Sequence, residues 1–128
     1  MGLLFPVGAA TSDRVIGAAI RVHRALGPGL LESAYQACLV RELELDGAEV
    51  RAEVEIPVRY RGVEVKAGFR ADLIVGSVII VEVKSVAKLI PIHEAQLLTY
   101  LRLTGLRTGL LFNFNSPVLK DGMRRLLL

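Results

Sequence analysis

Two short apolar runs joined at Gly76-Ser77 contain the residues whose types could do chemistry. Residues 70–85 read RADLIVGSVIIVEVKS, with Asp72 in the first run and Glu82 and Lys84 at the end of the second. Residues two apart on a strand point to the same face, so Glu82 and Lys84 project together. Two carboxylates suit Mg²⁺, which prefers oxygen ligands and keeps several waters. The stretch could therefore hold a divalent cation beside a lysine ammonium.

The turn between the two runs decides whether Asp72 can share that cation. A strict two-residue turn at Gly76-Ser77 would set Asp72 opposite Val81, so Glu82 would face away. A loop with an odd number of residues, or a bulge at Gly76, would bring both acids to one face, and glycine suits both. Otherwise Glu82 and Lys84 would form a surface ion pair and Asp72 would be solvated. These residues alone leave the two interpretations evenly balanced.

Further polar residues fall on two predicted helices. Gln96 and Tyr100 lie four apart and His93 lies three before Gln96, so all three share one side of their helix. Glu32 falls near the start of another helix, where the helix dipole favours an acid. Each also has a plain structural interpretation: a core aromatic for Tyr100, a surface amide for Gln96 and helix-end electrostatics for Glu32.

The elements that must position these residues follow from hydrophobic periodicity and from glycine and proline breakers. The order of a helix, three strands, a helix and a strand predicts an α/β sandwich around a central mixed sheet, with an extra N-terminal helix. The expected elements are helices over residues 12–26, 30–46 and 91–104, strands over 50–60, 63–73, 78–84 and 108–114, and a short helix within 118–128.

The first two strands are predicted to form one long hairpin. Apolar residues alternate with polar ones along both, and the parity changes after Gly62. A two-residue turn at Arg61-Gly62 would place all the apolar residues on a single face. Pro57 cannot donate to a ladder, which predicts that the first strand lies at an edge. The expected pairs are Tyr60 with Val63, Val58 with Val65, and Ile56 with Ala67.

Three motifs in this order resemble a known family. Residues 29–35 read GxxExxY, Asp72 is followed after nine residues by an ExK element at 82–84, and residues 96–100 read QxxxY. This set resembles the GxxExxY family of the PD-(D/E)XK nuclease superfamily, and its QxxxY element is similar to that of the RecB-like branch. The resemblance covers about residues 15–125 and implies a restriction-endonuclease-like core. The Pro of the superfamily's name is absent, and Ala71 stands before Asp72.

The resemblance implies a metal site. Asp72 and Glu82 would bind Mg²⁺ or Mn²⁺, with the backbone carbonyl of Val83 as a further ligand. Glu32 would reach the same pocket from its helix end, directly or through water.

The resemblance also implies roles in hydrolysis. Lys84 would orient or help deprotonate the attacking water and stabilise charge on the phosphate. Gln96 would position Lys84 or the water. Tyr100 would line the pocket or touch the nucleic acid backbone, and His93 lies on the same side of the helix.

Composition is compatible with this interpretation. The chain has 128 residues, 52% of them hydrophobic, which predicts one domain over residues 1–128 with a real core and a flexible arm at 1–11. A net charge of +3 permits a polyanionic partner without requiring one. No apolar run approaches the ~18 residues of a membrane span. The single Cys38 excludes an internal disulfide, so a reducing cytoplasm is expected.

Two functions from different classes fit these observations. The first is a divalent-metal-dependent nuclease that hydrolyses phosphodiester bonds, with DNA as the favoured substrate. The second is a catalytically silent module with the same fold that binds nucleic acid or a protein partner. The complete set of acids, lysine and glutamine favours the first. The small size suggests that substrate recognition needs a homodimer or a partner protein.

Overall fold

The computed structural model describes residues 7–66 and 68–128. It contains three α-helices, one short 3₁₀ helix and seven strands within those residues. In chain order they are α1 (Val7–Leu26), α2 (Glu32–Leu45), β1 (Val50–Glu55), β2 (Val58–Tyr60), β3 (Val63–Val65), β4 (Arg70–Val75), β5 (Ile79–Lys84), α3 (Pro91–Thr104), β6 (Thr108–Asn113), the 3₁₀ helix Leu119–Gly122 and β7 (Met123–Leu127).

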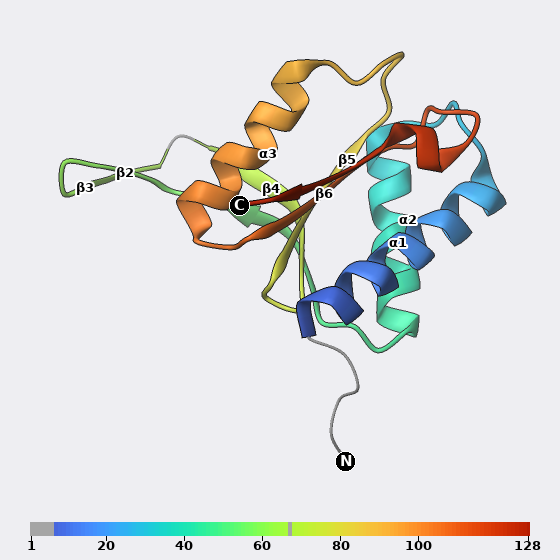
Figure 1. Ribbon diagram of the computed structural model, residues 1–128, viewed down its shortest axis with the longest axis horizontal. Helices are drawn as coiled ribbons and strands as arrows, with labels where there is room; N and C mark the ends of the chain where they lie inside the picture. The colour runs from blue at the N-terminus through green and yellow to red at the C-terminus, as the bar shows by residue number, and fades with distance from the viewer. Residues whose placement is uncertain (1–6, 67) are drawn as a thin grey trace.

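Five of the strands form one mixed sheet in the order β1-β4-β5-β6-β7. The pair β5–β6 is parallel and the other pairs are antiparallel. Helices α1 and α2 cover one face and α3 covers the other (Figure 1). The parallel pair is connected through α3, as a parallel crossover requires. The predicted α/β core with a central mixed sheet is confirmed.

The two faces of the sheet have separate hydrophobic cores. On the α1 and α2 face, the ring of Tyr35 stacks on that of Phe114, with 4.6 Å between centroids. On the α3 face, Leu97 and Leu101 pack against Ile80 and Leu111. Strand β5 is buried on both faces because it lies at the centre of the sheet, as its apolar sequence predicts.

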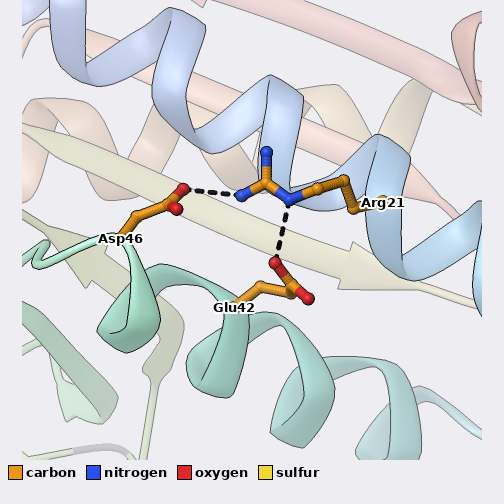
Figure 2. A network of polar contacts seen from close by, with 3 residues as sticks. All are labelled: Arg21, Glu42 and Asp46. Carbon is orange, nitrogen blue, oxygen red and sulfur yellow. Dashed lines mark hydrogen bonds and ion pairs between the residues drawn. The ribbon is translucent and has the colours of Figure 1, made fainter.

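Helices α1 and α2 are also joined by ion pairs at their exposed surface. The guanidinium of Arg21 donates to Glu42 Oε2 at 2.9 Å and to Asp46 Oδ2 at 2.6 Å (Figure 2). One arginine bridges two acids at the C-terminal end of α2, and pairs this exposed add little stability.

The predicted hairpin is divided into two parts. The tip pairs as expected, with Val58 opposite Val65 and Tyr60 opposite Val63. Below the tip the register shifts by two, because the Ile56 N–H donates to the carbonyl of Phe69. Ala67, the expected partner of Ile56, lies outside the described residues.

The apolar residues of this hairpin lie on two faces of the sheet, which corrects the prediction of a single face. Glu53 has a left-handed backbone, φ 53°, and interrupts the β1–β4 ladder. Before it, Val50 packs toward α1 and α2, whereas after it Val54 packs toward α3. β1 is an edge strand, and Pro57 falls between β1 and β2.

The two ends of the chain also differ from the predictions. Helix α1 begins at Val7, before the expected start at Ser12 or Asp13, and an alanine pair at residues 9–10 favours helix there. Residues 1–6 of the expected arm lie outside the described residues. The tail forms the short 3₁₀ helix Leu119–Gly122, inside the range expected to be helical, and its last residues form β7 because the edge of β6 offers them an antiparallel ladder. None of the helices in the described part of the chain is long and apolar enough to span a membrane.

Candidate active site

The loop between β4 and β5 places two acids opposite each other. Leu73 pairs with Val81 and Val75 with Ile79, so the connection has three residues, 76–78. Gly76 and Ser77 both have left-handed backbones, with φ of 59° and 56°. Continuing this register by one residue sets Asp72 opposite Glu82. The odd loop at Gly76 that the metal interpretation required is therefore present.

Asp72 is connected to β5 by its side chain rather than by a backbone hydrogen bond of the β4–β5 ladder. Its Oδ2 accepts a hydrogen bond from the Val83 N–H at 2.7 Å. Across β1, its opposite residue is Glu53, whose left-handed backbone interrupts the pairing. The Lys84 carbonyl accepts from Phe114 on the β6 side. Since successive carbonyls of a strand alternate in direction, the Val83 carbonyl points toward Asp72.

Glu82 is a buried acid without a complete set of partners. Its side chain is 3% exposed, and its Oε1 has no hydrogen-bond partner. Burial raises its pKa to about 9, assisted by the neighbouring Asp72 carboxyl, while Lys84 acts in the opposite direction. An orphaned buried acceptor facing a second carboxyl is the arrangement that a bound cation would satisfy.

A hydrogen-bond chain runs from β5 into α3. Lys84 Nζ donates to Gln96 Oε1 at 3.4 Å, and Gln96 Nε2 lies 3.2 Å from the Tyr100 hydroxyl. An ammonium can only donate, so Gln96 presents its oxygen to Lys84 and its NH₂ to Tyr100. Burial and the two acids, Glu82 first and then Asp72, raise the pKa of Tyr100. Tyr100 therefore stays protonated, and its own O–H remains available to another acceptor.

Glu32 and His93 lie at the margins of this arrangement. Exposed at the start of α2, Glu32 accepts the Ser85 N–H on Oε2 at 3.2 Å, directly after Lys84. It thus contacts the end of β5 rather than the two acids. The Nδ1 of His93 accepts the Ile90 N–H at 3.1 Å and caps its own helix. The expected convergence is seen for Gln96 and Tyr100, and the functions of Glu32 and His93 stay predictions.

Asn113 is a buried site residue that the sequence analysis did not single out. It lies beside Lys84 in the parallel register and is 3% exposed. Its amide accepts from the Val86 N–H and donates to the Val86 carbonyl, both at 3.0 Å, and also accepts from the Asn115 N–H. It holds the segment that follows Lys84. The sequence does carry a signal for Asn113, because this polar amide follows the apolar run Leu110-Leu111-Phe112 at the end of β6.

The donor set fits a hard divalent ion with few protein ligands. Nowhere in residues 7–66 and 68–128 do three or more His, Cys, Asp or Glu side chains gather closely enough to hold a metal. Asp72, Glu82 and the Val83 carbonyl would supply oxygen alone, and water would complete the coordination. Mg²⁺ is commonly bound in this way, through one or two carboxylates with several waters retained.

Comparison with known proteins identifies the family. The family description "PD-(D/E)XK nuclease superfamily" matches residues 9–126. No curated protein and no solved structure matches the chain. The match spans β1, β4, β5, β6, α2 and α3 in full, and nearly all of α1 and β7. The chain belongs to the PD-(D/E)XK nuclease superfamily.

Proposed function

We propose that this protein is a divalent-metal-dependent nuclease that hydrolyses phosphodiester bonds of DNA and belongs to the GxxExxY group with a RecB-like QxxxY element. One observation supports this most directly: Asp72 and Glu82 lie opposite each other, Lys84 shares the face of Glu82, and Glu82 Oε1 lacks a partner. The superfamily membership suggests the same chemistry. A single free cysteine is compatible with a cytoplasmic location.

The proposed metal site uses Asp72, Glu82 and the Val83 carbonyl for Mg²⁺ or Mn²⁺, with Glu32 within reach through water. When bound, such an ion would polarise a phosphoryl oxygen and lower the pKa of a coordinated water. The hydrogen bond from Val83 N–H restrains the Asp72 carboxylate beside β5. Glu32 fixes the backbone directly after Lys84 by accepting the Ser85 N–H.

Lys84 is the positively charged group of the site. Its ammonium projects from the same strand face as Glu82. Gln96 restricts the position of the ammonium by accepting a hydrogen bond from it. A second ammonium proton can then stabilise charge on a phosphate oxygen, or orient the attacking water. The Tyr100 hydroxyl, which accepts from Gln96, keeps its own hydrogen for a phosphate oxygen.

Cleavage of labelled single-stranded and double-stranded DNA, in Mg²⁺, Mn²⁺ or EDTA, tests the proposal. We expect cleavage with Mg²⁺ or Mn²⁺ and none in EDTA. Asp72→Asn and Lys84→Ala should each lower the rate by ~10²–10³-fold or more, comparable to deletion of one charge-stabilising donor. Asp13→Asn, the same change on an exposed part of α1, is the matched control. If the wild type binds no divalent ion and cuts no nucleic acid, the nuclease proposal is refuted and the catalytically silent binding module becomes the better interpretation.

A further inference from the structure

A mostly apolar pocket of about 270 Å³ lies between α3 and the strands that lead to the β2–β3 hairpin. Val58 and Phe69 line it from the hairpin side, and Ile92, Ala95 and Leu103 line it from α3. Its volume is below the ~300–1,000 Å³ of sites for whole drug-sized ligands. The pocket therefore suits one small group rather than a larger molecule.

The pocket adjoins the proposed catalytic residues. Gln96 and Tyr100 line its wall and also continue the hydrogen-bond chain that begins at Lys84. A group in the pocket would therefore lie one or two side chains away from the reacting phosphate. This proximity favours an occupant that is part of the substrate.

The hairpin extends the apolar surface beyond the pocket. It projects from the body on the α3 side, away from α1 and α2 (Figure 1). Its cross-strand pairs, Val58 with Val65 and Tyr60 with Val63, put four apolar side chains on one face. Tyr60 is 65% exposed, and Ile92, at the pocket edge, is 64% exposed. These side chains offer an exposed platform with an aromatic ring.

The same segment is strongly basic. Residues 58–70 contain four arginines and lysines and one glutamate, a formal charge of +3, equal to that of the whole chain. The guanidinium of Arg61 lies 5.7 Å from the centroid of the Tyr60 ring. Aromatic and apolar platforms flanked by cations bind single strands, because bases stack on the platform and phosphates meet the cations.

We propose that the pocket holds an unstacked base of a single-stranded segment of nucleic acid, with the hairpin cations on the flanking phosphates. This inference rests on the proposed function, because it takes the neighbouring acids and lysine as the cutting site. The bases of a duplex are stacked and their faces are covered, so only single strands or frayed ends can fill the pocket. The substrate class is thus single-stranded.

A second copy of the chain fits this surface less well. A two-fold interface through the hairpin would bring the same basic segment against itself. Like charges facing each other are destabilising, whereas phosphates are complementary to them.

Binding measured without cleavage tests the inference separately from the proposed function. The probe is a short fluorescein-labelled DNA strand, alone or annealed to its complement, with EDTA or with Ca²⁺ in place of Mg²⁺. Ala95→Leu fills the pocket with a good helix former, and Ile92→Ser removes an exposed apolar edge. Leu45→Ser, at an exposed position at the end of α2, is the matched control for Ile92→Ser.

We expect the wild type to bind the single strand at least tenfold more tightly than the duplex. Ala95→Leu and Ile92→Ser should each weaken single-strand binding by roughly 5- to 100-fold, the range for loss of one stacked base, with duplex binding unchanged. Leu45→Ser should bind as the wild type does. Single-strand preference in a protein that cuts nothing would support the pocket and refute the nuclease.

Three results would overturn the inference. Equal binding of single strand and duplex would refute it even if both are cut. Variants that keep the wild-type preference would show that the pocket is not used. A wild type that is dimeric in solution and becomes monomeric on Ile92→Ser would assign this surface to a second copy.

Discussion

Replacement of Glu82 by Gln should make the protein more stable at neutral and alkaline pH when no metal is present. The Glu82 carboxyl is buried, lies opposite Asp72 and has a pKa of about 9. In the unfolded chain the same group titrates near its ordinary value of 4.5. Gln keeps the size of the side chain but removes this titration, so the two proteins should respond differently to pH.

The sign and size follow from proton linkage. The folded state retains a proton that the unfolded state has lost between about pH 4.5 and about 9, so stability falls as pH rises through this interval. The slope is about 1.4 kcal/mol per pH unit, which gives a loss of about 3 kcal/mol from about pH 6 to about pH 8. A chain of this size has a total stability of roughly 5–15 kcal/mol, so the loss is easily measured.

Urea and thermal unfolding in EDTA, at several pH values across this interval, would measure the effect. The wild type should lose about 3 kcal/mol, or roughly 10 °C in Tm, relative to Glu82→Gln between about pH 6 and about pH 8. Glu64→Gln, at an exposed position of the hairpin, is the matched control and should follow the wild type. Saturating Mg²⁺ should remove most of the wild-type loss, since a cation favours the ionised form.

A wild type and Glu82→Gln with parallel pH profiles in EDTA would refute this reasoning. It would mean that Glu82 ionises in the folded protein near its ordinary pKa, with water or Lys84 satisfying the carboxylate. The same result would weaken the metal site, because an orphaned buried acid is the observation that calls for a cation.

Two further predictions concern the neighbouring residues. In calorimetric titration with Mn²⁺, Asp72→Asn should weaken binding of the ion. Lys84→Ala should leave this binding equal or slightly tighter, because a nearby positive charge is removed. Loss of Mn²⁺ binding in Lys84→Ala alone would contradict the assigned roles. Asn113→Ala should lower the free energy of unfolding by about 1–3 kcal/mol in urea, because it leaves the half-buried Val86 N–H without its acceptor and removes one of the two donors to the Val86 carbonyl; it should also slow cleavage. Asn115→Ala, which removes only a 3.3 Å hydrogen bond to the Val86 carbonyl, should have a smaller effect on the free energy of unfolding and on the cleavage rate.

Much of the central fold could be predicted because local and global preferences agree there. The continuous apolar run of residues 78–81, which Val83 extends on one face, predicts a central strand, and Pro91 and Gly105 delimit α3. The i, i+4 spacing placed Gln96 and Tyr100 on one side of their helix, and the family resemblance implied that this side faces Lys84. The alternation of side chains along the strands left Asp72 either on the same face as Glu82 or on the opposite face. The three-residue loop puts it on the same face.

The parts that could not be predicted depend on contacts distant in sequence. Glu53 adopts a left-handed backbone that its residue type does not indicate, and its Oε1 accepts a 2.8 Å hydrogen bond from Gln36 Nε2 of α2, a partner distant in sequence. The tail becomes β7 only because β6 has a free edge, and a short helical pattern cannot reveal that edge. Glu32 bonds to the Ser85 backbone, a partner that helical spacing does not specify.

The irregular backbone around the site has a common physical result. The three-residue loop puts Asp72 opposite Glu82, and the left-handed Glu53 interrupts the ladder on the other side of Asp72. Asp72 can therefore direct its carboxylate to the Val83 amide while facing a second acid. A regular two-residue hairpin would have put the two acids on opposite faces of the sheet. Strain at these positions persists because the two cores on either side of the sheet hold the strands in place.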